Sequence, residues 1–184
     1  MLKPIRRVVT GHDANGKAVV IVDGPAPNVV VSVHRPGGRT NVWRTTGSPA
    51  VYGGNRDAAA ADVSFTLEPP PGGTNFRISE YPPESEAPSA RADFQKAFAE
   101  VGGAHRLADG ARHPMMHRTE TVDYAIVLEG EIVMLLDDED VPLRAGDVVI
   151  QRGTNHCWVN RSDRLARIAF ILIDGVDADG KKRE

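Results

Sequence analysis

Two histidines and one aspartate carry the clearest chemical signal in the sequence. His117 and Asp123 lie in the segment HPMMHRTETVDYAIVLEGEI, and His156 lies downstream in AGDVVIQRGTNHCWVN. Two imidazoles and a carboxylate match the composition that holds divalent metals with positions left open for substrate. Without a metal, either histidine could act as general base while Asp123 orients it, because an imidazole titrates near neutral pH. These three residues are the predicted catalytic groups.

Alternation along β-strands would bring the three groups onto inward faces. Successive side chains of a strand point to opposite sides, so Thr119 shares a face with His117 and Asp123. By the same rule Trp158 shares the face of His156 and would form an apolar wall beside it. A bulge between His117 and Asp123 would break this alternation.

Four residues are candidates for substrate binding. Arg112 could hold a substrate carboxylate bidentately, although solvation at the surface is the default for an arginine. Met116 has the polarisable side chain of an adaptable pocket, although core or rim packing is the alternative. Thr119 and Trp158 complete the set, because both lie on the predicted inward faces.

His113 is a weaker candidate metal ligand. It precedes His117 by four residues, as in helical metal sites, but Pro114 biases His113 away from helical angles. We therefore expect a loop histidine at the mouth of the pocket. For His117 and His156 the structural alternative is that they hydrogen-bond each other or the backbone inside a polar core.

Short β-rich runs fill the C-terminal part of the chain. Turn residues of the types Gly, Asp, Asn and Ser separate them at close spacing, which is typical of antiparallel strands that close into a sandwich or barrel. The expected strands cover residues 122–130, 131–136, 141–143, 147–151, 156–160 and 167–174.

The first half is strand-like but less regular, and one helix follows it. Proline and glycine clusters separate expected strands at residues 18–24, 29–34, 63–68 and 76–81. In SARADFQKAFAEVGG, apolar residues follow the spacing of one helical face, with Ser89 as N-cap and Gly102 as the stop. We expect this helix to cover an open barrel end, and a lid over the pocket is the alternative.

The two segments that hold the histidines resemble the two sequence motifs of the cupin superfamily. In that family the first motif places two histidines and a glutamate before a strand that ends in a glycine turn, and the second supplies another histidine. Counted back from Gly130, Asp123 stands at the glutamate position, and Gly153 precedes His156 by the family's spacing. The HRT-x-T-x-DY form of the first motif resembles a subgroup of small bacterial and fungal cupins.

The sequence departs from the metal-binding pattern that this resemblance implies. Metal-dependent cupins usually offer three histidines and one glutamate, but the alignment places Thr119 at one histidine position. Asp123 is also one methylene shorter than the family's glutamate. The resemblance therefore implies a divalent metal (iron, manganese, nickel or zinc) with an incomplete set of ligands, namely His117, Asp123 and His156, or no cofactor.

The resemblance implies a single all-β domain built around an RmlC-like cupin barrel, a jelly roll or double-stranded β-helix, with a β-rich N-terminal extension and one short helix. An alternative is that the N-terminal half is a degenerate second cupin unit. The expected parts are an extension at residues 1–88 that packs on or extends the barrel, the helix at 89–103, the barrel core at 104–175 and a polar tail at 176–184.

Composition limits the partners. The formal net charge of -3 gives no general attraction for nucleic acid or anionic lipid. No apolar run approaches the length of a membrane span, and the first residues do not form a signal peptide, so we expect a cytoplasmic protein. Cys157 is the only cysteine, which excludes an intramolecular disulfide. We also expect a homodimer, because the proline-rich N-terminal strands have little core of their own.

The leading hypothesis for function is a small-molecule enzyme of lyase or isomerase type. Dehydration, decarboxylation or tautomerisation of a small oxo or carboxylate compound would each suit a base and a polarising group, with or without a metal. One alternative is a non-catalytic barrel that binds or senses a small ligand. Another is a dioxygenase that holds iron at His117, Asp123 and His156.

Overall fold

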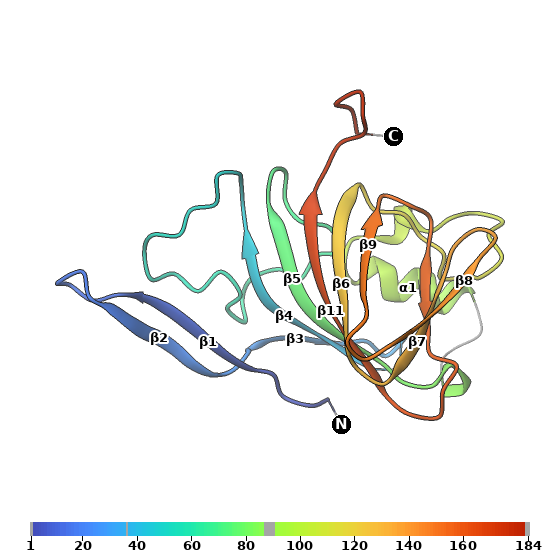
Figure 1. The fold of residues 1–184 in the computed structure, drawn as a ribbon, viewed down its shortest axis with the longest axis horizontal. Coiled ribbons are helices and arrows are strands. Elements are labelled where there is room, and N and C mark those ends of the chain that lie inside the picture. Colours follow the sequence, from blue (N-terminus) through green and yellow to red (C-terminus); the bar gives the residue numbers. More distant parts are fainter. Residues whose placement is uncertain (1, 36, 87–90, 183–184) are drawn as a thin grey trace.

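The computed structural model describes residues 2–35, 37–86 and 91–182, and two facing sheets dominate it (Figure 1). The larger sheet has six antiparallel strands in the order β3-β4-β5-β11-β6-β9. Its strands are β3 (Asn28–Val31), β4 (Gly38–Thr45), β5 (Thr74–Tyr81), β6 (Thr121–Glu129), β9 (Val148–Arg152) and β11 (Ala166–Asp174). The predicted all-β class is confirmed.

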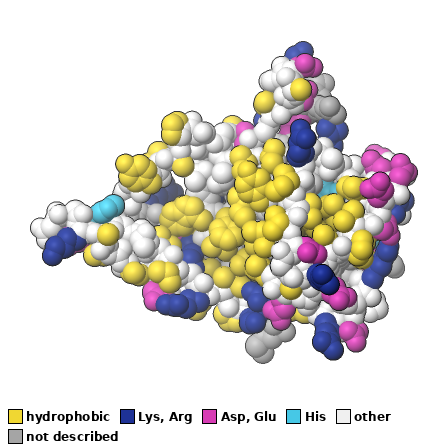
Figure 2. All heavy atoms as spheres, viewed as in Figure 1, with side chains coloured by type: hydrophobic (Ala, Val, Ile, Leu, Met, Phe, Trp, Pro, Cys, Tyr) yellow, Lys and Arg dark blue, Asp and Glu magenta, His cyan; other side chains and the backbone are white. Residues whose placement is uncertain are grey.

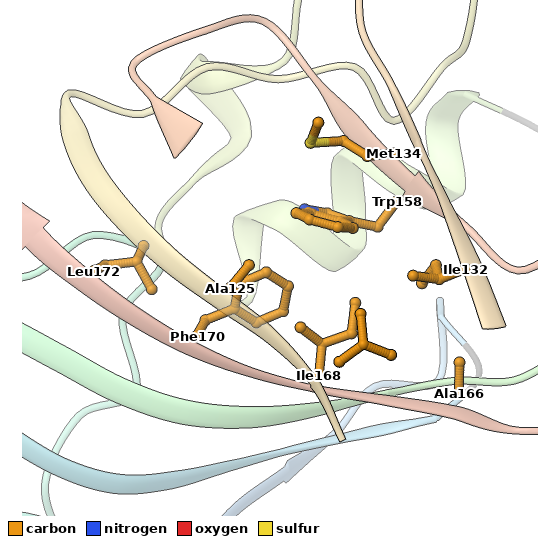
Figure 3. Packing of buried hydrophobic residues seen from close by; sticks show 9 residues of the cluster. Ala125, Ile132, Met134, Trp158, Ala166, Ile168, Phe170 and Leu172 are labelled. Carbon is orange, nitrogen blue, oxygen red and sulfur yellow. The ribbon is translucent and has the colours of Figure 1, made fainter. Parts of the chain in front are cut away.

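A three-stranded sheet lies opposite, in the order β10-β7-β8. Its strands are β7 (Glu131–Leu135), β8 (Asp140–Arg144) and β10 (Cys157–Val159). The core forms where the inward side chains of the two sheets meet, because each strand buries one face. Figure 3 shows Trp158 of β10 against Phe170 of β11, with ring centroids 5.4 Å apart in an edge-to-face arrangement.

The N-terminal half contributes to the same large sheet. Strand β5 pairs with the central strand β11 from Tyr81↔Ala166 to Thr74↔Ile173, and β4 and β3 continue the sheet beyond it. Strands β1 (Arg6–His12) and β2 (Ala18–Pro25) form a separate hairpin that projects from the body of the molecule (Figure 1). Residues from both halves of the chain therefore face one interior.

The prediction of a strand at residues 63–68 is wrong, and the sequence did not predict strands β1 and β4. Residues 63–68 form a loop whose carbonyl groups serve side chains of β5: Arg77 donates to Leu67 O (2.9 Å), and Asn75 donates to Glu68 O (2.9 Å). Strand β4 has the sequence GRTNVWRT, in which the buried positions are largely polar. The usual contrast between apolar inward and polar outward positions is therefore missing from β4.

The predicted helix is present as α1 (Arg91–Ala99), with one-turn helices η1 (Glu84–Glu86) and η2 (Ala104–Arg106) on either side. The predicted N-cap, Ser89, lies outside the described residues. The predicted stop is confirmed, because Gly102 takes a φ of 70° and Gly103 N–H donates to Phe98 O at 2.7 Å. Among the described residues, no helix is long and apolar enough to cross a membrane.

Candidate active site

The inner faces of the two sheets line a small cavity of about 50 Å³. The three predicted catalytic residues, His117, Asp123 and His156, all line it, and so do Thr119 and Trp158. Phe98 of α1 also reaches the cavity, and its ring lies 4.9 Å from the His117 ring, centroid to centroid. Phe98 therefore makes α1 part of the cavity wall.

The backbone brings His117 and His156 together. Each residue donates its amide N–H to the other's carbonyl oxygen at 2.9 Å, so the two form an isolated antiparallel bridge. Directly opposed residues of this kind have neighbouring side chains. The two imidazole centroids accordingly lie 4.6 Å apart.

The same backbone fixes the protonation of both rings. Nδ1 of His117 lies 2.9 Å from Met115 O, and Nδ1 of His156 lies 3.0 Å from Thr154 O. A carbonyl oxygen only accepts hydrogen bonds, so each Nδ1 carries the proton and each neutral ring keeps a lone pair on Nε2. Burial lowers the pKa of His156 to about 4 and holds that of His117 well below its usual value, a shift to which the neighbouring His156 adds. Both imidazoles are therefore neutral bases at pH 7.

Asp123 is the acidic residue that lines the cavity. It lies on β6 with 5% of its surface exposed, and its Oδ1 has no hydrogen-bond partner among the described residues. Burial raises the pKa of Asp123 to about 6, against the opposing effects of a hydrogen bond from Thr121 and the charge of Arg77. This carboxyl group can change its protonation state close to neutral pH.

Three arginines also line the cavity, and reasoning from the sequence missed all of them. Arg35, Arg39 and Arg77 come from the N-terminal half, and each has less than a tenth of its surface exposed. Arginine is usually a surface residue, so the residue type did not indicate a position in the cavity. Alternation in β5 gives the opposite signal, because the apolar Phe76 and Ile78 would be expected to face inward, whereas the structure buries Arg77.

Comparison with known proteins decides the family. Residues 104–173 match the family model described as Cupin domain. In an alignment 193 positions long, the chain is 33% identical to the phomopsin biosynthesis cluster protein C' of Diaporthe leptostromiformis, covering 98% of this chain and 85% of that protein. The chain belongs to the cupin superfamily.

Two further cupins show the range of similar proteins. The cupin-domain-containing oxidoreductase fogC of Aspergillus ruber is 26% identical over 100% of this chain and 80% of its own. A solved structure, a Cupin 2 conserved barrel domain protein from Salinispora arenicola, aligns with 55% of this chain and 63% of its own at 17% identity and a TM-score of 0.35.

The metal set expected for this cupin is not formed. Within the described parts of the chain, no three His, Cys, Asp or Glu side chains are grouped so that they could hold one metal ion. His117 and His156 lie together with their Nε2 lone pairs available, but Asp123 does not join them as a third ligand. The residues present therefore do not fit the two-histidine, one-carboxylate site that the sequence predicted.

Arg112, a predicted substrate-binding residue, lies away from the cavity. Its Nε donates to Leu136 O at 2.7 Å, its Nη2 donates to Glu139 O at 2.6 Å, and its Nη1 forms an ion pair with Asp140 at 2.7 Å. These bonds fasten the exposed Arg112 to the turn between β7 and β8. The side chain does not line the cavity.

Met116, a predicted substrate contact, and His113, the weaker candidate metal ligand, also lie outside the cavity. Met116 is fully buried in a separate apolar cluster with Leu135, Cys157 and Val159. The cavity is lined by Met115 instead, which has the parity of His117 and could have been predicted from it. His113 pairs with Glu84, with Nε2 3.2 Å from Oε1.

Proposed function

We propose that this cupin is an enzyme that moves a proton on a small oxo or carboxylate compound, as an isomerase or lyase does. The observation that carries the proposal is the pair of neutral imidazoles, each with Nδ1 bound to a backbone carbonyl and Nε2 left basic. A fixed tautomer and a neutral ring meet two requirements of a general base, because the proton acceptor must be unprotonated and correctly oriented.

His117 is the better placed of the two bases. It keeps some exposed surface, whereas His156 is 2% exposed. In the proposed reaction Nε2 of His117 accepts a proton from a carbon next to a carbonyl group, and the electron pair of the broken C–H bond moves into an enolate. The proton then returns at another atom, which gives a tautomer, or the enolate expels a leaving group, which gives an elimination.

Asp123 is the proposed proton donor to the substrate oxygen. Its pKa of about 6 leaves part of the population protonated near neutral pH, and its Oδ1 is free to bond a substrate. A base and an acid that line one cavity and differ in pKa are the arrangement that proton shuttling needs.

A second candidate is an oxidoreductase, and it is favoured by the similarity to fogC, a cupin-domain-containing oxidoreductase, at 26% identity. An oxygen-using form would require iron bound by His117, Asp123 and His156. The described residues do not form that three-ligand group, so the proton-transfer reaction is the better match to the geometry.

Deuterium exchange tests the proposal. We expect the protein to accelerate the exchange of the hydrogens next to the carbonyl group of small 2-oxo acids in D₂O. Proton NMR measures this exchange for each compound of a panel of such acids. His117→Gln should slow exchange by about 10²- to 10⁴-fold, the usual contribution of a general base. His113→Gln is the matched control, because His113 lies outside the cavity, and it should exchange at the normal rate.

Two results would contradict the proposal. One is a wild-type protein that accelerates exchange no more than buffer alone for every compound in the panel. The other is exchange at the wild-type rate by the double variant His117→Gln/His156→Gln. Oxygen consumption that depends on added iron, without exchange, would favour the oxidoreductase instead.

A further inference from the structure

The charges that line the cavity do not balance. Arg35, Arg39 and Arg77 contribute three guanidinium groups, and Asp123 is the single carboxylate among the lining residues. Burying a charge without a partner is costly, so buried arginines are normally paired with a carboxylate or another anion.

Elsewhere in this protein, poorly exposed arginines do have such partners. Arg7 forms a bidentate ion pair with Asp57, and Arg106 pairs with Glu68 at 3.0 Å. None of the three cavity arginines forms an ion pair with any residue in the described ranges. The difference marks the cavity as a place where positive charge is kept available.

Two of the three arginines are held in place by the protein itself. Arg77 donates to Leu67 O at 2.9 Å, and its guanidinium carbon lies 5.9 Å from the centre of the Phe170 ring. Arg35 donates to Glu80 O at 3.2 Å and lies 4.5 Å from the centre of the Tyr81 ring. These contacts fix the guanidinium groups without neutralising them.

Arg39 has no comparable restraint. Its side chain makes no hydrogen bond with the described residues, although the residue is only 8% exposed and lines the cavity. Burial, together with the charges of Arg35 and Arg77, lowers the pKa of Arg39 to about 9, so the group remains charged at pH 7. Glu100 and Tyr81 favour its charged form, but neither forms an ion pair or a hydrogen bond with Arg39 in the part of the chain that the structure describes. The guanidinium therefore faces the cavity without a directly bonded anion.

We propose that Arg39, supported by Arg35 and Arg77, binds the carboxylate of the substrate. The planar guanidinium matches a carboxylate in a bidentate arrangement. The small cavity of about 50 Å³ favours a short acid, and Trp158 and Phe170 provide apolar walls for its body. This inference rests on the proposed function only in taking the cavity as the substrate site, and it names the substrate class as a carboxylic acid.

The placement suits the proposed chemistry. The charges of Arg39 and Arg77 both help to lower the pKa of His117, so these arginines and the histidine act within one site. A carboxylate bound by these arginines would bring the adjacent carbon toward the histidine pair. The arginines would also stabilise the negative charge that grows on the substrate when the proton leaves.

Binding of acetate, compared with uncharged acetamide of the same shape, tests the inference. Calorimetric titration in Tris chloride at constant ionic strength should show acetate binding to the wild-type protein and no binding of acetamide. Arg39→Met should weaken acetate binding about tenfold or more, because a hydrogen-bonded charge pair is lost. Arg164→Met is the matched control, since Arg164 is exposed and its substitution changes the net charge by the same amount.

Thermal unfolding separates a binding role from a structural one. If Arg39 is kept for an anion, Arg39→Met without ligand should unfold at the same temperature as the wild type or higher, because an unpaired buried charge is removed. A clearly lower unfolding temperature than that of Arg164→Met would mean that Arg39 holds the fold together, and would overturn the inference. Arg39→Lys, which keeps the charge but loses the bidentate geometry, should also bind acetate more weakly.

Other outcomes also decide the matter. Equal binding of acetate and acetamide by the wild type, or binding of inorganic phosphate without binding of acetate, would overturn the carboxylate assignment. The binding experiment and the deuterium-exchange experiment can fail independently of each other. Acetate binding without exchange would leave the arginine site standing and remove the proton-transfer proposal, and exchange without selectivity for acetate would do the reverse.

Discussion

His156 makes the free energy of unfolding depend on pH, because its proton affinity differs between the folded and the unfolded chain. In the folded protein burial lowers its pKa to about 4, whereas the unfolded chain should show the usual value near 6.5. Between these two values the unfolded state binds more protons, so the free energy of unfolding falls as the pH decreases.

For His156 alone, this effect should remove about 2 to 3 kcal/mol of stability between pH 7 and pH 4.5. Urea unfolding at both pH values measures it. In His156→Gln the loss over the same interval should be smaller by that amount. An equal loss in wild type and variant would show that His156 is not buried in its neutral form.

Asp123 should act in the opposite direction. Its folded pKa of about 6 lies above the usual value of 3.8, so stability is lost as the pH rises through this range and the ionised carboxylate is buried. Asp123→Asn should therefore be more stable than the wild type at pH 7.5, by up to about 3 kcal/mol, and the gain should shrink at pH 4.5.

Urea unfolding of Asp123→Asn, with Asp138→Asn as control, checks this prediction. Asp138 is exposed, so its substitution should change the free energy of unfolding by less than about 0.5 kcal/mol. A loss of stability in Asp123→Asn at pH 7.5 would contradict the assigned burial of a charged carboxylate, and would point to a structural role for it.

At the scale of elements, the turn between β6 and β7 depends on Gly130. Its φ of 76° lies in the left-handed region, and a β-carbon there would lie 2.6 Å from Leu165 O. Gly102 at the end of α1 has a similar φ of 70° but open space around it. The pair therefore separates backbone strain from steric clash.

Gly102→Ala should cost about 1 kcal/mol of the free energy of unfolding, from the left-handed conformation alone. Gly130→Ala should cost at least about 1 kcal/mol more, because the added methyl group displaces backbone. Urea unfolding of both variants measures the difference. Equal costs would mean that the β6–β7 turn yields more easily than its packing implies.

The strands of the C-terminal half could be predicted from the sequence because their turns contain glycine, aspartate and asparagine at close spacing. Strand β4 could not, since its buried residues Arg39, Thr40 and Asn41 are polar. The loop at 63–68 was mistaken for a strand because Val63, Phe65 and Leu67 alternate with polar residues. Its carbonyl groups instead bind Arg77 and Asn75 of β5.

The sequence predicted the histidines and the aspartate of the candidate site but not its arginines. His117, Asp123 and His156 carry the resemblance and meet in the cavity, but the three arginines come from segments without a motif. Their approach depends on the pairing of β5 with β11, a contact between residues about 90 positions apart. Such pairing depends on the whole fold and leaves no local pattern.

At the scale of the whole molecule, the outer face of the six-stranded sheet is apolar. Figure 2 shows hydrophobic side chains gathered over strands β5, β11, β6 and β9. Tyr124, Leu128, Val148 and Ile150 are each more than 40% exposed there. Exposed apolar patches of this kind usually mark protein interfaces.

We expect this face to join two copies of the chain as a homodimer, since a surface that repeats in both copies can pair with itself. Light scattering at micromolar concentration should give twice the mass of one chain. Ile150→Glu should give a folded monomer, because it places a charge in the apolar face, whereas Val176→Glu, in the exposed C-terminal segment, should not. A monomeric wild type would contradict the expectation.

The central claim is that the two cavity histidines are neutral bases with Nε2 unprotonated, and ring nitrogen-15 chemical shifts measure this directly. At pH 7, heteronuclear NMR of the protein labelled at histidine should show protonated Nδ1 and unprotonated Nε2 for both His117 and His156, with assignments from His117→Gln and His156→Gln. An imidazolium, or the opposite tautomer, at either residue would contradict the account.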